Sequence, residues 1–102
     1  MTVILEKVRR LERYVQATDG QVDAVLESTI DKLLGGERQR LAGQLARLKS
    51  QVAEFESRYG WPSEEFYPRF ERGELGDEMD FMEWSATVEM IRNLQSEIDS
   101  LG

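Results

Sequence analysis

The sequence contains neither cysteine nor histidine. Without cysteine there is no disulfide bond and no thiol nucleophile, and without both residues the usual ligands of a zinc site are missing. Histidine is also the side chain that most often transfers protons near neutral pH. These absences favour a binding protein over an enzyme, and we expect no cofactor and no metal site.

Long apolar runs are missing as well. The longest are triplets such as Val3-Ile4-Leu5 and Ala24-Val25-Leu26, far short of the roughly 20 residues that a membrane-spanning helix needs. The first residues also lack the pattern of a secretory signal peptide. We therefore expect a cytoplasmic protein with no membrane partner.

Charge is plentiful but unevenly distributed. The 102 residues carry 13 basic and 20 acidic side chains, a net charge of −7. Residues 61–102 hold three of the basic and eleven of the acidic side chains. A net negative charge opposes nonspecific binding to nucleic acid and to anionic membranes. The acidic last third favours a basic protein partner.

Two long segments have apolar residues at spacings of three and four, which place them on one face of a helix. The first stripe comprises Leu41, Leu45, Leu48, Val52, Phe55 and Tyr59, and the second comprises Trp84, Val88, Ile91, Leu94, Ile98 and Leu101. The segment that carries the second stripe begins at Asp77. About seventeen residues therefore connect the two segments, enough for an antiparallel hairpin in which each stripe covers the other. A chain this short buries only a thin core by itself, so we expect a homodimer or other homo-oligomer with coiled-coil character.

The sequence of residues 1–35 predicts two shorter elements. Residues 1–5 fit either a brief strand or the start of the following helix, which should end near Thr18-Asp19-Gly20. Asp23 then lies near the start of a second helix. Gly35-Gly36 marks either a break or a loosened point in one long helix. The predicted fold is all-α, with an N-terminal dimerisation segment, residues 1–35, and a helical hairpin, residues 36–102.

The hairpin connection has its own signals. Gly60 and Pro62 should end the first long helix. Ser63 is a candidate N-cap for a short helix in which Pro68 should cause a kink or a shortened turn. Asp77 is a candidate N-cap for the last helix, with Asp80 in the position of a capping-box acid.

The connection and its flanks also hold most of the aromatic residues, together with acidic ones. Trp and Tyr commonly anchor protein interfaces, so Trp61 and Tyr67 are the leading candidates, although packing in the core explains several of the other rings equally well. The acidic side chains suit the first turn of a helix better than a metal site. The candidate partner-binding residues are Tyr59, Trp61, Phe66, Tyr67, Phe70, Glu74, Leu75, Asp77, Asp80 and Trp84.

A separate candidate surface lies near the N-terminus. Lys7, Arg9, Arg10 and Arg13 form a basic group that is interrupted by acidic residues. Such a group is more often a solvated helix face than a DNA-binding surface, but operator DNA is a possible ligand.

Two family resemblances add to these patterns. Residues 2–34 resemble a degenerate ribbon-helix-helix module, through Leu11 to Val15, Gly20 and the segment 22–30. In that family a strand reads the major groove, but the first six residues here offer little to a base edge, so the resemblance implies dimerisation more than DNA reading.

Residues 58–84 are similar to a motif of small helical prokaryotic antitoxin-like proteins, through Arg58-Tyr59-Gly60, Ser63-Glu64-Glu65-Phe66, Phe70-Glu71, Gly73-Glu74-Leu75-Gly76-Asp77 and Glu83-Trp84.

The second resemblance implies an antitoxin-like protein that neutralises a small, basic protein toxin through its acidic, aromatic C-terminal half. Two alternatives remain open at this point. One is a transcriptional repressor that uses the N-terminal segment, and the other is a structural coiled-coil adaptor.

Overall fold

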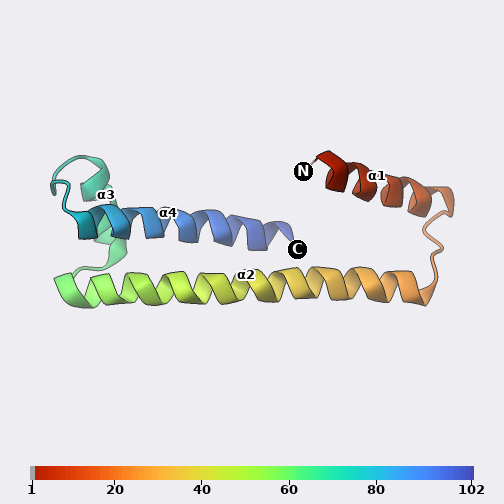
Figure 1. Ribbon diagram of the computed structural model, residues 1–102, viewed down its shortest axis with the longest axis horizontal. Coiled ribbons are helices and arrows are strands. Elements are labelled where there is room, and N and C mark those ends of the chain that lie inside the picture. Colours follow the sequence, from red (N-terminus) through yellow and green to blue (C-terminus); the bar gives the residue numbers. More distant parts are fainter. Residues whose placement is uncertain (1) are drawn as a thin grey trace. The chain divides into compact units, whose positions relative to one another are not determined.

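The computed structural model describes residues 2–102 and consists of helices and short connections (Figure 1). Four helices follow one another along the chain: α1 (Thr2–Ala17), α2 (Ala24–Tyr59), α3 (Ser63–Glu71) and α4 (Met79–Ser100). The predicted all-α class is confirmed. The chain divides into two units, Met1–Gly35 and Gly36–Gly102.

The first unit contains α1 and the start of α2. Residues 2–17 are helical throughout, so the alternative of an N-terminal strand is wrong for the described residues, and Met1 lies outside them. The helix ends where predicted: Gly20 has a φ of 79°, and its amide donates to the Val15 carbonyl at 2.9 Å. Asp23 then caps α2, because its Oδ1 accepts a hydrogen bond from the Leu26 amide at 2.8 Å.

The long helix α2 passes through Gly35 and Gly36 without interruption. Of the two alternatives for this pair, the break is wrong. Each glycine costs about 1 kcal/mol relative to alanine inside a helix. The flanking residues Leu33, Leu34 and Glu37 favour the helix, and its continuity over 36 residues shows that the glycines are tolerated.

In the second unit α2 and α4 lie side by side and antiparallel, which confirms the predicted hairpin (Figure 1). Their two apolar stripes face each other. Leu41 and Val52 of α2 and Trp84, Val88 and Leu94 of α4 are buried. The remaining stripe residues are half-buried: Leu45, Leu48, Phe55, Tyr59, Ile91, Ile98 and Leu101. At the open end of the hairpin, Nη2 of Arg38 donates to the Leu101 carbonyl at 3.1 Å.

At the closed end of the hairpin, α2 ends where predicted, but the predicted N-cap residues do not cap α3 and α4. Gly60 has a φ of 72° and donates to the Glu56 carbonyl at 2.8 Å, which ends α2. Ser63 is the first residue of α3, and Pro62 occupies the N-cap position. Instead of capping through its side chain, Ser63 donates its amide to Oε2 of Glu56 at 2.7 Å.

Two further local predictions are wrong: the shortened turn at Pro68 and the cap at Asp77. Pro68 does not shorten α3, which continues through it to Glu71. Asp77 does not cap α4, because the helix begins at Met79 with Glu78 at the N-cap and no side-chain cap bond. Asp80 therefore takes no part in a capping box and makes contacts with α2 instead.

Candidate protein-binding site

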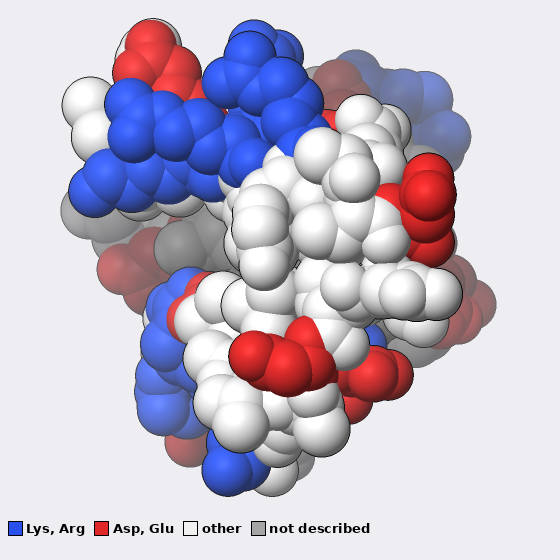
Figure 2. Space-filling model, turned by 90° about the vertical axis from the view of Figure 1, so that its right-hand side faces the viewer, with Lys and Arg blue, Asp and Glu red and all other residues white. Residues whose placement is uncertain are grey.

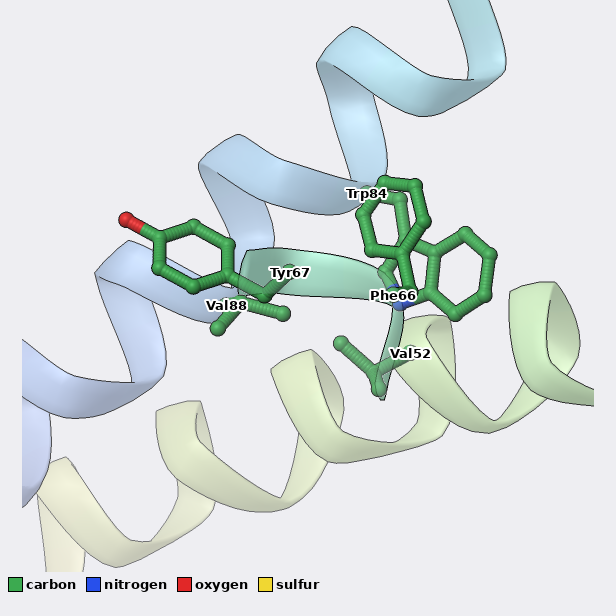
Figure 3. Packing of buried hydrophobic residues seen from close by; sticks show 5 residues of the cluster. All are labelled: Val52, Phe66, Tyr67, Trp84 and Val88. Carbon is green, nitrogen blue, oxygen red and sulfur yellow. The ribbon is translucent and has the colours of Figure 1, made fainter. Parts of the chain in front are cut away.

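An aromatic cluster holds the three helices of the second unit together (Figure 3). Trp84 of α4 and Phe66 of α3 are both 0 % exposed. Their rings stack with centroids 3.8 Å apart and planes within 2° of parallel. Val52 of α2 and Val88 of α4 complete the buried set with Tyr67. These contacts hold α3 against α4 and so fix the position of the hairpin connection.

The polar atoms of this cluster are paired within the chain. Nε1 of Trp84 donates a hydrogen bond to Oγ of Ser63 at 2.8 Å, which ties α4 to the first residue of α3. Phe55 and Tyr59 of α2 stack against the other parts of the Trp84 ring, with centroids 5.8 and 6.0 Å away. Such aromatic pairs add to the stabilisation that burial itself provides.

Asp80 makes a second link between α4 and α2. Its Oδ2 accepts hydrogen bonds from the Tyr59 hydroxyl and, at 2.9 Å, from Nη1 of Arg58. The bond from Tyr59 and then the bond from Arg58 hold the pKa of the Asp80 carboxyl below its ordinary value. The same bond to Asp80 raises the pKa of Tyr59. Asp80 was predicted to face a partner, but its charge is already engaged inside the chain.

Tyr67 is similarly engaged. It is 5 % exposed, and its hydroxyl donates to Oε1 of Glu89 at 2.7 Å. The Arg92 guanidinium lies over its ring, 4.4 Å from the centroid. The bond to Glu89, followed by burial, raises the pKa of Tyr67 to about 12. In this conformation Tyr67 supports the junction of α3 and α4 and presents no face to a partner.

The other predicted contact residues divide by exposure. Phe66 and Trp84 are core residues, as the alternative interpretation of the aromatic residues allowed. Trp61 is half-buried under Arg69, whose guanidinium lies 5.2 Å from its ring centroid. Glu74 and Asp77 are exposed, and Glu74 pairs with Arg72 at 2.7 Å. Half-buried positions in the same end of the hairpin are Tyr59, Phe70 and Leu75.

Sequence reasoning missed a groove that runs along the hairpin between α2 and α4. The groove is open to solvent and has a volume of about 500 Å³. Its lining combines apolar and acidic side chains from both helices: Gln51, Glu54, Phe55, Arg58, Asp80, Glu83, Ala86, Thr87 and Met90. Met90 is 52 % exposed.

The charge of the groove is negative. Three carboxylates, those of Glu54, Asp80 and Glu83, line it together with the single guanidinium of Arg58. Arg58 is paired with Asp80 at 2.9 Å, so Glu54 and Glu83 are left to act on a ligand. A groove lined by both apolar and acidic side chains suits a ligand that has an apolar face flanked by Lys or Arg.

A signal for this groove is present in the sequence. Met79, Glu83, Ala86 and Met90 follow spacings of four, three and four, which puts them on one face of α4. This face differs from the one that holds Trp84 and Val88. The second face was hidden because its apolar members are methionine and alanine, which together with Glu83 resemble an ordinary solvated surface.

The predicted DNA-binding residues lie on α1 in the first unit. Arg9, Arg10 and Arg13 line a shallow hollow together with Glu6. Figure 2 shows Lys and Arg side chains gathered in the upper part of the view. Lys7 is exposed on the same helix but does not line that hollow.

Comparisons with known proteins leave the chain without an assigned family. No family model matches it, and no significant match is found among curated proteins or solved structures.

Over residues 2–102, no helix combines the length and the apolar character needed to cross a membrane. In the same range, no three or more acidic side chains are arranged to hold a metal ion.

Proposed function

We propose that this protein is an antitoxin-like binding protein of the cytoplasm, which neutralises a small basic protein toxin by covering part of the toxin's surface. The observation that supports the proposal best is the acidic groove between α2 and α4, with Phe55 and Met90 among its apolar lining residues. The resemblance of residues 58–84 to antitoxin-like proteins supports it independently.

The groove favours a helix or an extended segment of the toxin as the bound element. Grooves between helices commonly receive an amphipathic helix whose apolar face enters the groove. Methionine side chains adapt to different apolar shapes, and Met90 contributes such a side chain. Glu54 and Glu83 would then pair with basic residues at the edges of the toxin helix.

The aromatic cluster has a supporting role in this proposal. Trp84 and Phe66 fix α3 against α4, and Asp80 fixes α4 against α2 through Arg58 and Tyr59. A preformed groove loses little conformational freedom when a partner binds, which favours affinity. Trp61, Glu74 and Asp77 stay candidates for a second contact at the closed end of the hairpin.

The test is coexpression of the full chain with the product of the adjacent reading frame. We expect a complex on size-exclusion chromatography and rescue of growth. Replacing both groove glutamates, Glu54→Arg with Glu83→Arg, should weaken the complex at least about 100-fold, because two attractive charges become repulsive. Glu97→Arg on α4, outside the groove lining, is the matched control and should bind like the wild type.

Three results would contradict this proposal or the place that it gives to the contact. Absence of both the complex and growth rescue would remove the antitoxin function. If the groove variant binds with unchanged affinity, the groove is not the contact site. If only the double variant Glu74→Arg with Asp77→Arg loses affinity, the contact lies at the closed end of the hairpin instead.

A second candidate function is transcriptional repression, favoured by the three arginines that gather on α1. DNA binding through phosphate contacts weakens steeply as salt rises. Binding to the protein's own promoter should therefore fall with salt and disappear in the triple variant Arg9→Ala, Arg10→Ala and Arg13→Ala. Binding that is absent or insensitive to salt would exclude this function.

A further inference from the structure

The described part of the first unit, residues 2–35, has no core of its own. No residue of α1 is buried, and every side chain of residues 24–35 is exposed or half-buried. Nine large apolar side chains in this unit are exposed: Val3, Ile4, Leu5, Val8, Leu11, Tyr14, Val25, Leu33 and Leu34. Helices in proteins owe most of their stability to packing of an apolar face, so this surface requires a cover.

Each helix of this unit carries an apolar stripe. On α1, Ile4, Val8, Leu11 and Val15 follow spacings of four, three and four. On α2, Leu26, Ile30 and Leu33 follow the same rule, and the turn capped by Asp23 joins the two helices.

We propose that this surface is where two copies of the chain dimerise, with α1 and the first turns of α2 from each copy forming a four-helix bundle. A second copy brings an identical stripe of the same length, so one surface covers the other in a symmetric contact. Four of the nine exposed side chains, Ile4, Val8, Leu11 and Leu33, lie on the stripes and five lie beside them. All nine together present on the order of 900 Å², comparable to the roughly 800 Å² that each partner buries in a standard interface.

The charge of the unit supports a second copy over a membrane surface as the cover. Residues 1–35 carry five basic and six acidic side chains, a net charge of −1, so the two contact surfaces themselves meet without strong repulsion. Residues 36–102 carry the remaining eight basic and fourteen acidic side chains, a net charge of −6. An anionic lipid surface attracts the arginines of α1 but repels this larger unit.

This dimer is independent of the proposed toxin contact and is tested on the full chain alone by sedimentation equilibrium. We expect twice the 11.8 kDa mass of one chain. Val8→Asp should weaken dimerisation at least about 100-fold, because it places a charge in an apolar contact. Val8 is 54 % exposed in the single chain, so the change leaves the fold of one copy intact. Arg9→Asp, one residue on and outside the apolar stripe, is the matched control and should stay dimeric.

Because the chain has no cysteine, a single introduced thiol provides a second measurement. Spin-labelled Arg9→Cys should give an intermolecular dipolar signal that is lost when Val8→Asp is added. A monomeric wild type would overturn the proposal, whether it stays free in solution or sediments with vesicles of phosphatidylcholine and phosphatidylserine. A dimer that Val8→Asp leaves unchanged would overturn it as well, because the contact would then lie elsewhere.

Discussion

The hydrogen bond between Trp84 and Ser63 gives a sharp test of the aromatic cluster. The indole is 0 % exposed, and its Nε1 donates to Oγ of Ser63 at 2.8 Å. Ser63→Ala removes the acceptor and leaves a buried N–H without a partner, which costs about 1–3 kcal/mol. The total free energy of unfolding for a chain of this length is on the order of 5–15 kcal/mol, so the loss is readily measured.

The assay is urea unfolding followed by far-UV circular dichroism, at one fixed protein concentration for all variants. Ser57→Ala is the matched control, because Ser57 is exposed on α2. It should change the free energy of unfolding by less than about 0.5 kcal/mol.

A double-mutant cycle isolates the bond itself. In a Trp84→Phe background no indole N–H remains, so Ser63→Ala should then cost less than about 0.5 kcal/mol. Equal costs of Ser63→Ala in the two backgrounds would refute the reasoning, because the loss would then have nothing to do with the indole. A cost indistinguishable from that of Ser57→Ala would refute it too.

Three further predictions concern individual residues. Tyr67 favours its protonated form in the folded chain, so this contribution to stability is complete below its ordinary pKa of 10.0 and is lost as pH rises through about 12. Glu89→Gln should lower the pKa of Tyr67 in a spectrophotometric titration. An unchanged pKa would contradict the view that the bond to Glu89 raises it. Asp80 has a folded pKa below 3.8, so its contribution to stability is present above that pH and is lost as pH falls through the folded pKa. In Asp80→Asn the free energy of unfolding, measured by urea titration at several pH values, should fall less steeply at acidic pH than in the wild type. The same dependence on pH in both proteins would contradict the role of Asp80. Gly60→Ala should destabilise by about 1 kcal/mol because φ is 72°, whereas Gly43→Ala inside α2 should stabilise by up to about 1 kcal/mol; the same sign for both in thermal unfolding would contradict this.

The hairpin was predictable because its information is local and repeated. Leu41 to Tyr59 and Trp84 to Leu101 keep their spacings over several turns, and only an antiparallel pairing lets each stripe cover the other. The breaks at Gly20 and Gly60 were predictable for a similar reason, since each has the positive φ that glycine accepts most readily.

The caps were not predictable because tertiary contacts replace local ones. Ser63 looks like an N-cap in isolation, yet its hydroxyl accepts from Trp84 and its amide donates to Glu56 of another helix. Asp80 looks like a capping-box acid, but Arg58 and Tyr59 bind it from α2. No short-range rule includes partners that lie about twenty residues away.

The candidate site was only partly predictable. An acidic and aromatic region in the C-terminal part follows from composition, but the exposure of each ring depends on how α3 is rotated against α4. Phe66 and Tyr67 are neighbours in sequence and both are covered, which a single apolar stripe on α3 does not predict. The groove was missed because it needs two helices to form, and its apolar members on α4, Ala86 and Met90, share a face with Glu83.

The central claim is that the groove between α2 and α4 receives the partner, and methionine methyl NMR tests it most directly. The chain would be labelled with ¹³C-methyl methionine and titrated with the product of the adjacent reading frame. Met90 lines the groove, whereas Met82, equally 52 % exposed on α4, does not. We predict that the Met90 signal shifts and broadens while the Met82 signal stays in place. A Met90 signal that is unchanged at saturation would contradict the claim.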